Sequence, residues 1–281
     1  MNLANPYEHM IAIKTDSPLA KASLALTSFV IDALFKNVEP IRLARAAGSL
    51  IFCGASPSLP LFAQTIIRLK ACRQNDEAWS DPEESAWAVR TMSSAIGPSD
   101  PIIESVVQWL HAVRKTSGGW GRHTRDQARI PTTGLISALV PSVIKPDDIT
   151  WLANEWQRDY EGHVRLSYKA GFFLLAMREG YANNLVGQTV EHLAKDQNED
   201  GGFGPWRNHP IGSDPWSTGV VLWGLSRWIR IVDKAVINKA ISWLEKTQLP
   251  SGYWPYHYLD DGTSLALIGA VAAMKALANI E

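Results

Sequence analysis

Cysteine is scarce in this sequence: the 281 residues include only Cys53 and Cys72, and no CxxC pair. Two thiols cannot form a disulfide framework, and without further ligands they do not form a zinc site. The cytoplasm, where thiols stay reduced, is therefore the expected location.

An excess of one charge is also lacking, since 27 Lys and Arg face 28 Asp and Glu, giving a formal charge of −1. Nucleic-acid-binding proteins normally carry a basic face, so no nucleic-acid partner is expected. The longest apolar runs, near 24–35 and 264–274, are shorter than the roughly 20 residues of a membrane span. The N-terminus has no basic region followed by an apolar run. We expect no signal peptide and no transmembrane segment, and at most a peripheral position on a membrane.

Strand patterns are nearly absent, because apolar and polar residues hardly ever alternate between turn residues. Apolar residues instead recur at helical spacing, and Pro and Gly separate the segments. The pattern predicts twelve helices, at 17–35, 39–52, 59–73, 83–96, 100–116, 131–140, 147–158, 165–179, 184–197, 215–230, 234–247 and 262–279.

Tryptophan is in excess, with 12 Trp against 7 Phe and 7 Tyr, and much of the excess follows a repeat. Four stretches have a long polar residue, then Gly four residues later (Glu77 in the first), then an aromatic two residues beyond. The stretches are 73–79, 114–120, 197–203 and 248–254. A degenerate copy near 156–163 retains Gly162. After each full copy a helix opens with two small residues, namely Ser85-Ala86, Thr132-Thr133, Ser217-Thr218 and Thr263-Ser264.

Such a repeat indicates helical hairpins that are too small to bury their apolar faces alone and must stack. Six hairpins can close into a ring, so we predict an all-α fold, a single (α/α)6 toroid over residues 1–281. Residues 1–16 would be an N-terminal arm, and 70–281 hold the clearest repeats. We expect the Gly to adopt positive φ, the aromatic to cover a helix end, and the Gln amide to bind backbone groups there.

The residues Gln248, Gly252 and Trp254 match the QxxxGxW repeat completely. The copy ending at Phe203 has Phe for Trp, and the copy ending at Trp120 has Arg for Gln. QxxxGxW resembles the repeat of squalene–hopene and oxidosqualene cyclases, within the superfamily of terpenoid cyclases and protein prenyltransferases. The resemblance implies a small class II-type cyclase that binds a hydrophobic isoprenoid in a central aromatic cavity. Family cyclases usually place the active site between two such domains, so a homodimer or a partner domain is an alternative.

Cyclases of this family protonate an alkene or epoxide with the middle Asp of a DxDD motif, and three stretches here come near that motif. Aligning Thr263-Ser264 with the family's helix start puts Asp261 at the acid position, beside Asp260. In 214–218 the first acid, Asp214, is present, whereas in 81–84 Glu83 takes the middle position. For all of these acids, capping of a helix N-terminus is the alternative interpretation.

Carbocations are stabilised by aromatic faces, and aromatic residues are frequent in loops near the candidate acids. The candidates for substrate binding are Trp206, Trp216, Tyr253, Tyr256, His257 and Tyr258. Trp79, Trp120 and Trp254 belong to the repeat and are expected to be structural.

A basic cluster of Arg122, His123 and Arg125, with Arg129 nearby, can be interpreted as a diphosphate-binding site or as solvated loop charge. Neither a zinc site of the prenyltransferase type nor a DDxxD motif is present. No cofactor is expected, apart from Mg²⁺ if the substrate carries a diphosphate.

Two other functions remain open at this stage. One is a non-catalytic toroid that binds a hydrophobic chain or serves as a partner subunit. The other is a sugar hydrolase or lyase with two carboxylates facing each other across the cavity.

Overall fold

The computed structural model describes residues 17–74 and 78–280, and within them the chain forms twelve α-helices, two short 3₁₀ helices and no strand. The predicted arm at 1–16 and Glu77 lie outside the described residues. The all-α prediction is confirmed, and the helices are α1 (Pro18–Phe35), α2 (Pro40–Phe52), α3 (Pro60–Ala71), α4 (Pro82–Ile96), α5 (Pro101–Val113), α6 (Ile130–Leu139), η1 (Pro141–Val143), α7 (Pro146–Glu161), α8 (Ser167–Ala176), α9 (Asn183–Asp196), α10 (Pro215–Ser226), η2 (Ile229–Ile231), α11 (Lys234–Thr247) and α12 (Leu259–Ala278).

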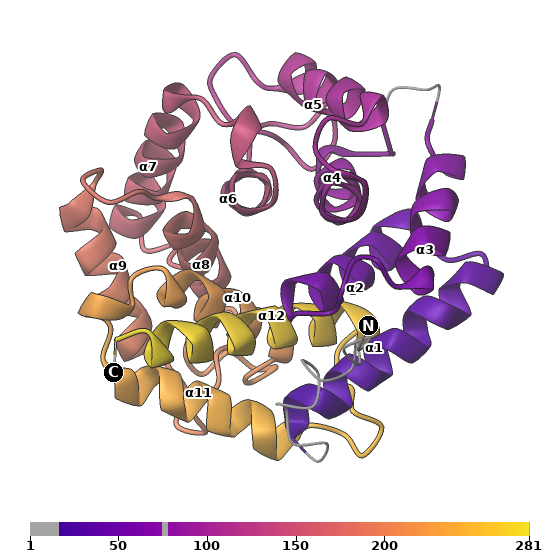
Figure 1. Ribbon diagram of the computed structural model, residues 1–281. Coiled ribbons are helices and arrows are strands. Elements are labelled where there is room, and N and C mark those ends of the chain that lie inside the picture. The colour runs from indigo at the N-terminus through magenta and orange to yellow at the C-terminus, as the bar shows by residue number, and fades with distance from the viewer. Residues whose placement is uncertain (1–16, 75–77, 281) are drawn as a thin grey trace.

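The even-numbered α-helices form an inner ring, in which α2 contacts α4, each contacts the next, and α12 returns to α2. The odd-numbered helices lie around them (Figure 1). Burial explains the division. Ten of the 12 residues of α10 and 12 of the 20 residues of α12 are buried, whereas an outer helix such as α11 buries only one face.

Two helices, α1 and α12, are long and apolar enough to cross a membrane by length and composition. α12 belongs to the inner ring and packs against α10 and α2. Most of the α1 span is not buried within the ring. The absence of a transmembrane segment stays a prediction.

The aromatic residues of the repeat hold the ends of outer helices. The indole N–H groups of Trp79, Trp120 and Trp254 each donate to a carbonyl ten residues earlier, at 3.1, 2.8 and 2.7 Å. These carbonyls lie near the C-terminal ends of α3, α5 and α11. The backbone N–H of each repeat aromatic also donates to a hydroxyl of the next inner helix, and the acceptors are Ser85, Thr133, Thr218 and Thr263. Each copy therefore joins an outer helix to the inner helix that follows it.

The Gln residues of the repeat join neighbouring hairpins. Gln197 donates to Val236 O in the first turn of α11, at 2.9 Å. Gln248 donates to Pro18 O at the start of α1, at 2.7 Å, and so closes the ring. Both amides also donate to the repeat Gly carbonyl of their own loop, at 2.8 Å. The expected contact of the repeat Trp residues with a helix end is confirmed. The Gln amides differ from the expectation, since they bind a loop carbonyl and the first turn of the next outer helix.

The degenerate copy differs from the others. Gly162 has φ −75°, whereas Gly118, Gly201 and Gly252 have φ of 108°, 95° and 86°. The position two residues beyond Gly162 holds Val164, which has no indole, and Trp156 lies within α7 and donates to Thr189 on α9. The stretch near 156–163 is therefore not a structural copy of the repeat.

The start of α12 also differs from the sequence prediction. The helix begins at Leu259 and not near 262, and Tyr258 is its N-cap residue. Asp260 and Asp261 consequently lie inside the first turn, so the interpretation of these two acids as N-caps is wrong.

A substitution at Gly252 tests the contact between the last repeat loop and α1, which closes the ring. Gly252 has φ 86°, and an added Cβ would collide with the carbonyl of Lys21 on α1. Gly252→Ala is expected to lower the free energy of unfolding by about 1–3 kcal/mol, because both the backbone conformation and the contact exclude a side chain. Urea titrations followed by circular dichroism measure the effect.

The matched control is Gly187→Ala on α9, where no atom lies within 4 Å of an added Cβ. That change should leave stability unchanged or raise it by up to about 1 kcal/mol. Equal midpoints for Gly252→Ala and wild type would contradict the role of Gly252.

Candidate active site

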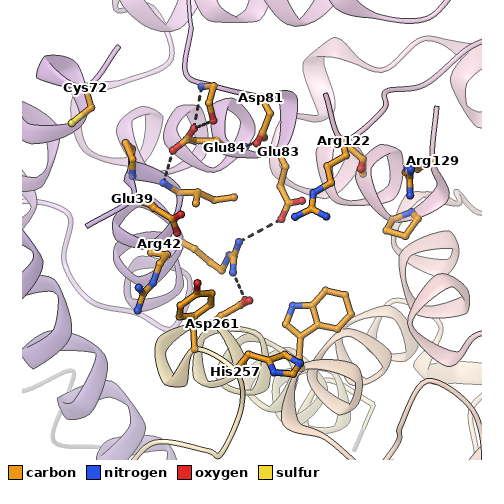
Figure 2. Close-up of a pocket in the computed structure, with 18 of the residues that line it drawn as sticks. Glu39, Arg42, Cys72, Asp81, Glu83, Glu84, Arg122, Arg129, His257 and Asp261 are labelled. Atoms are coloured by element: carbon orange, nitrogen blue, oxygen red, sulfur yellow. Dashed lines mark hydrogen bonds and ion pairs between the residues drawn. The ribbon is translucent and has the colours of Figure 1, made fainter. Parts of the chain in front are cut away.

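A cavity of about 770 Å³ lies at the end of the ring where the inner helices begin. Its size is in the usual range of small-molecule sites. The first turns of α2, α4, α6, α10 and α12 and the loops before them form its wall (Figure 2). The residues that carry polar or aromatic groups into the lining include Glu39, Arg42, Arg45, Asp81, Glu83, Arg122, Arg129, Trp216, Tyr256, His257, Tyr258 and Asp261.

Arg45 on α2 lies between two carboxylates of neighbouring helices. Its guanidinium forms an ion pair with Asp261 on α12, and its Nη2 lies 3.5 Å from Oε1 of Glu83 on α4. The Arg45 side chain is 9% exposed, against 19% for Asp261 and 30% for Glu83. Three inner helices thus contribute one cation and two acids to the same wall.

Burial raises the pKa of Glu83, and the lowering influence of Arg45 does not cancel it. Asp81 and Asp261 raise this pKa further, whereas Arg122 lowers it. Burial lowers the pKa of Arg45, but the two carboxylates outweigh burial and the net pKa is raised. One guanidinium therefore faces two carboxyl groups. The raised pKa means that Glu83 holds a proton more readily than a solvated Glu does.

Asp260 is turned away from the cavity, although it adjoins Asp261 in sequence. It is 3% exposed, does not line the cavity, and binds the guanidinium of Arg42 through both carboxylate oxygens. The same guanidinium lies over the ring of Tyr258, 4.3 Å from its centroid. Asp260 therefore ties α12 to α2 and holds Arg42 in place.

Asp214 and Asp81 are helix caps. Asp214 accepts from the N–H of Ser217 at 2.7 Å, and burial raises its pKa. Asp81 accepts from the N–H of Glu84 at 2.8 Å. The capping interpretation is confirmed for both, and of the two only Asp81 lines the cavity.

Two aromatic rings face the cavity as a stacked pair. Trp216 and Tyr256 lie with ring centroids 6.5 Å apart and planes 4° from parallel. Tyr168 and Phe172 meet Trp216 edge-on from α8. Burial also raises the pKa of the Tyr256 hydroxyl. His257 and Tyr258 complete this side of the lining.

Two aromatic candidates lie elsewhere. Trp206 is 45% exposed and contacts His209 edge-on, at 4.2 Å between centroids. The Tyr253 hydroxyl donates to Ala25 O on α1 at 2.8 Å, so this ring packs between outer elements. Neither residue lines the cavity.

The residues of the basic cluster also lie partly inside and partly outside the cavity. Arg122 and Arg129 line the cavity, whereas His123 and Arg125 are exposed outside it. Arg129 is paired with Asp126 at 2.6 Å. Within residues 17–74 and 78–280 the Arg122 guanidinium has no hydrogen bond or ion pair, and it points into the cavity beside Glu83 (Figure 2).

Sequence reasoning missed Arg42 and Arg45. A sequence pattern that could have identified them is the pair of Arg residues beside Leu43 and Ala44, on a helix whose other central residues are small or buried. A buried cation at such a position needs an anionic partner from another element. Among the described residues, no three His, Cys, Asp or Glu side chains gather in an arrangement that could hold a metal ion.

No known protein-family profile and no curated protein matches the chain. Solved structures do match. The type II terpene cyclase MstE from Scytonema, in complex with geranylgeranyl dihydroxybenzoate as substrate, has a TM-score of 0.68 at 14% identity, over 92% of this chain and 98% of that chain. MstE with the product merosterolic acid A gives 0.69 at 15% identity over the same shares. A protein from Actinoplanes gives 0.69 at 12%, over 91% and 99%. The chain therefore has the fold of a type II terpene cyclase.

The raised pKa of Glu83 predicts a pH dependence of stability. A raised folded-state pKa contributes stability below the unfolded-state pKa and loses it as the pH rises through the folded-state value. Relative to Glu83→Gln, which cannot ionise, wild type should lose stability as the pH rises from about 4. Urea unfolding of both proteins between pH 4 and 8 measures the difference. A free energy of unfolding that rises with pH for wild type relative to Glu83→Gln would contradict the raised pKa of Glu83.

Proposed function

We propose that this chain is a class II-type terpenoid cyclase, in which Glu83 donates a proton to an isoprenoid bound in the 770 Å³ cavity. One observation carries the proposal: a carboxyl group with a raised pKa shares a cavity with a stacked pair of aromatic rings. An acid that keeps its proton and π faces that stabilise cations are the two groups that such a reaction needs.

Proton transfer from Glu83 to an alkene carbon or an epoxide oxygen leaves a carbocation on the substrate and a carboxylate on Glu83. The Arg45 guanidinium, 3.5 Å away, stabilises the new carboxylate. Asp261 holds Arg45 from the opposite side. The comparison with the DxDD motif places Asp261 at the acid position. Its ion pair with Arg45 instead favours a role in which Asp261 positions Arg45.

Trp216 and Tyr256 are proposed to stabilise the migrating cation. The π face of each ring attracts a cation electrostatically without bonding to it, and a cation over an indole face is attracted by roughly 0.5–2 kcal/mol. Tyr168 and Phe172 fix the Trp216 ring edge-on, which limits its reorientation during the reaction.

Arg122 is proposed to bind an anionic head group of the substrate, because its guanidinium faces the cavity without a partner among the described residues. A carboxylate or a diphosphate would both accept its hydrogen bonds. Mg²⁺ would accompany only a diphosphate. The match to MstE supports the proposal that a single ring is sufficient for cyclase activity, since this chain spans 98% of a protein described as a type II terpene cyclase.

The alternative function is a hydrophobic-ligand-binding or partner-subunit toroid, and the surface at the open end of the ring favours it. Tyr258 and Leu259, at the start of α12, are 52% and 42% exposed, and Trp206 is 45% exposed. A second copy or a partner domain that covers these side chains would enclose the cavity. Light scattering with and without ligand tests this alternative.

Glu83→Gln tests the acid. The amide keeps the size of the side chain but has no acidic proton, so turnover should fall by a factor of at least about 10². The protein is incubated with geranyl, farnesyl and geranylgeranyl diphosphates, geranylgeranyl dihydroxybenzoate and squalene, and products are identified by gas chromatography–mass spectrometry. Glu191→Gln, an exposed site on α9, is the control and should keep wild-type turnover. Full turnover by Glu83→Gln would refute Glu83 as the acid, and no product from any substrate would favour the alternative function.

Trp216→Leu tests the aromatic wall. Removing the indole should lower the cyclisation rate about tenfold and increase the share of early-terminated products, because the cation loses a π face. Trp206→Leu serves as the matched control, since this indole lies outside the cavity. An unchanged product profile for Trp216→Leu would argue against its proposed role.

A further inference from the structure

A second hollow lies at the opposite end of the ring from the candidate active site. It is a groove of about 490 Å³ formed by the C-terminal half of α4, by α5, and by the end of α6 with η1. These elements contact one another and lie side by side in Figure 1. Most of the groove wall is apolar, and its main contributors are Pro98, Ile103, Val107, Leu139 and Val140.

Arg90 is the one cation in the lining of this groove. Within residues 17–74 and 78–280 its guanidinium forms no hydrogen bond or ion pair, unlike Arg42, Arg45 and Arg129 at the other end. Glu104, the other charged residue of the lining, is exposed on α5. Arg90 is exposed like Glu104, so the groove places a solvent-accessible cation without a partner among the described residues next to apolar surface.

Behind Arg90 the groove adjoins a small chamber on the axis of the ring. Arg90 and Leu139 line both spaces, and the chamber holds about 30 Å³ between Phe52, Trp87 and Trp223. Trp87 is 1% exposed, and its indole N–H has no hydrogen-bond partner among the described residues. A buried donor without an acceptor costs about 1–3 kcal/mol, so such groups usually meet a partner.

We propose that the groove is a binding site for a single-chain amphiphile with a carboxylate head group. The carboxylate would accept from the Arg90 guanidinium and from the Trp87 N–H, and the chain would lie along the apolar wall. The unpaired cation, the orphaned donor and the apolar groove are adjacent through shared lining residues. The chamber of about 30 Å³ can take a small carboxylate group but is too small for a peptide segment. The site is separate from the cavity that holds Glu83, and the proposal does not depend on the cyclase activity.

Decanoate is a suitable probe, and two measurements on the full-length protein report its binding. Isothermal titration calorimetry of Arg122→Met, which has lost the free cation of the large cavity, should still give a saturable site, and decyltrimethylammonium should not bind there. In a ¹H–¹⁵N correlation spectrum, the indole resonance that is missing in Trp87→Phe should shift on addition of decanoate. Arg90→Met should weaken binding at least tenfold, since it removes the charge-assisted hydrogen bonds but keeps the aliphatic stem. Val107→Trp, which fills the groove, should abolish binding.

Arg230→Met and Arg122→Met are the controls. The first removes an exposed cation in η2, and the second removes the free cation of the large cavity. Arg230→Met should bind decanoate as wild type does. Arg122→Met separates the two cavities: it should keep the groove site with unchanged affinity and lose only binding in the large cavity. The proposal is overturned if decanoate does not bind at millimolar concentration, or if Arg90→Met and Val107→Trp bind it with unchanged affinity. It is also overturned if Arg122→Met alone abolishes binding, because the ligand would then occupy the large cavity.

Discussion

The six inner helices begin at the same end of the ring, and this shared direction determines the chemistry of the molecule. Each helix N-terminus carries a partial positive charge and unsatisfied N–H groups, so carboxylates gather there. Asp81 and Asp214 are N-cap residues, and each accepts a hydrogen bond from one of these N–H groups. Once the caps are in place, further acids in the first turns are available for other roles. Glu83 and Asp261 are such acids, and Arg45 from the helix between them joins the two.

The repeat loops maintain this arrangement from outside. Each indole binds the end of an outer helix, and the backbone of the same loop binds a hydroxyl in the first turn of the next inner helix. The first turns that line the cavity are therefore positioned by hydrogen bonds to the outer layer. Together with the close packing of the inner helices, these directed bonds fix the height of Glu83 and Asp261 relative to Arg45.

The sequence predicted most of the fold, because helix periodicity, Pro starts and the loop repeat are local signals. The parts that it did not predict depend on contacts between distant segments. Asp260 and Asp261 look alike in sequence, yet successive helical residues point about 100° apart, so their roles depend on where α12 begins. Its start at Leu259 turns Asp260 toward Arg42 and Asp261 toward the cavity. Arg45 lies 216 positions before its partner Asp261, and no local pattern links the two.

The hydrogen bond from Gln248 to Pro18 joins residues 230 positions apart in the chain. Such a contact can form only after the segments between them have been synthesised. During synthesis α1 and α2 emerge before their partners in α12. Until then Arg45 and Arg42 have no carboxylate from α12 beside them. Contacts of such long sequence separation form late because loop closure must precede them. The cavity therefore acquires its charge pattern only once α12 has joined the ring.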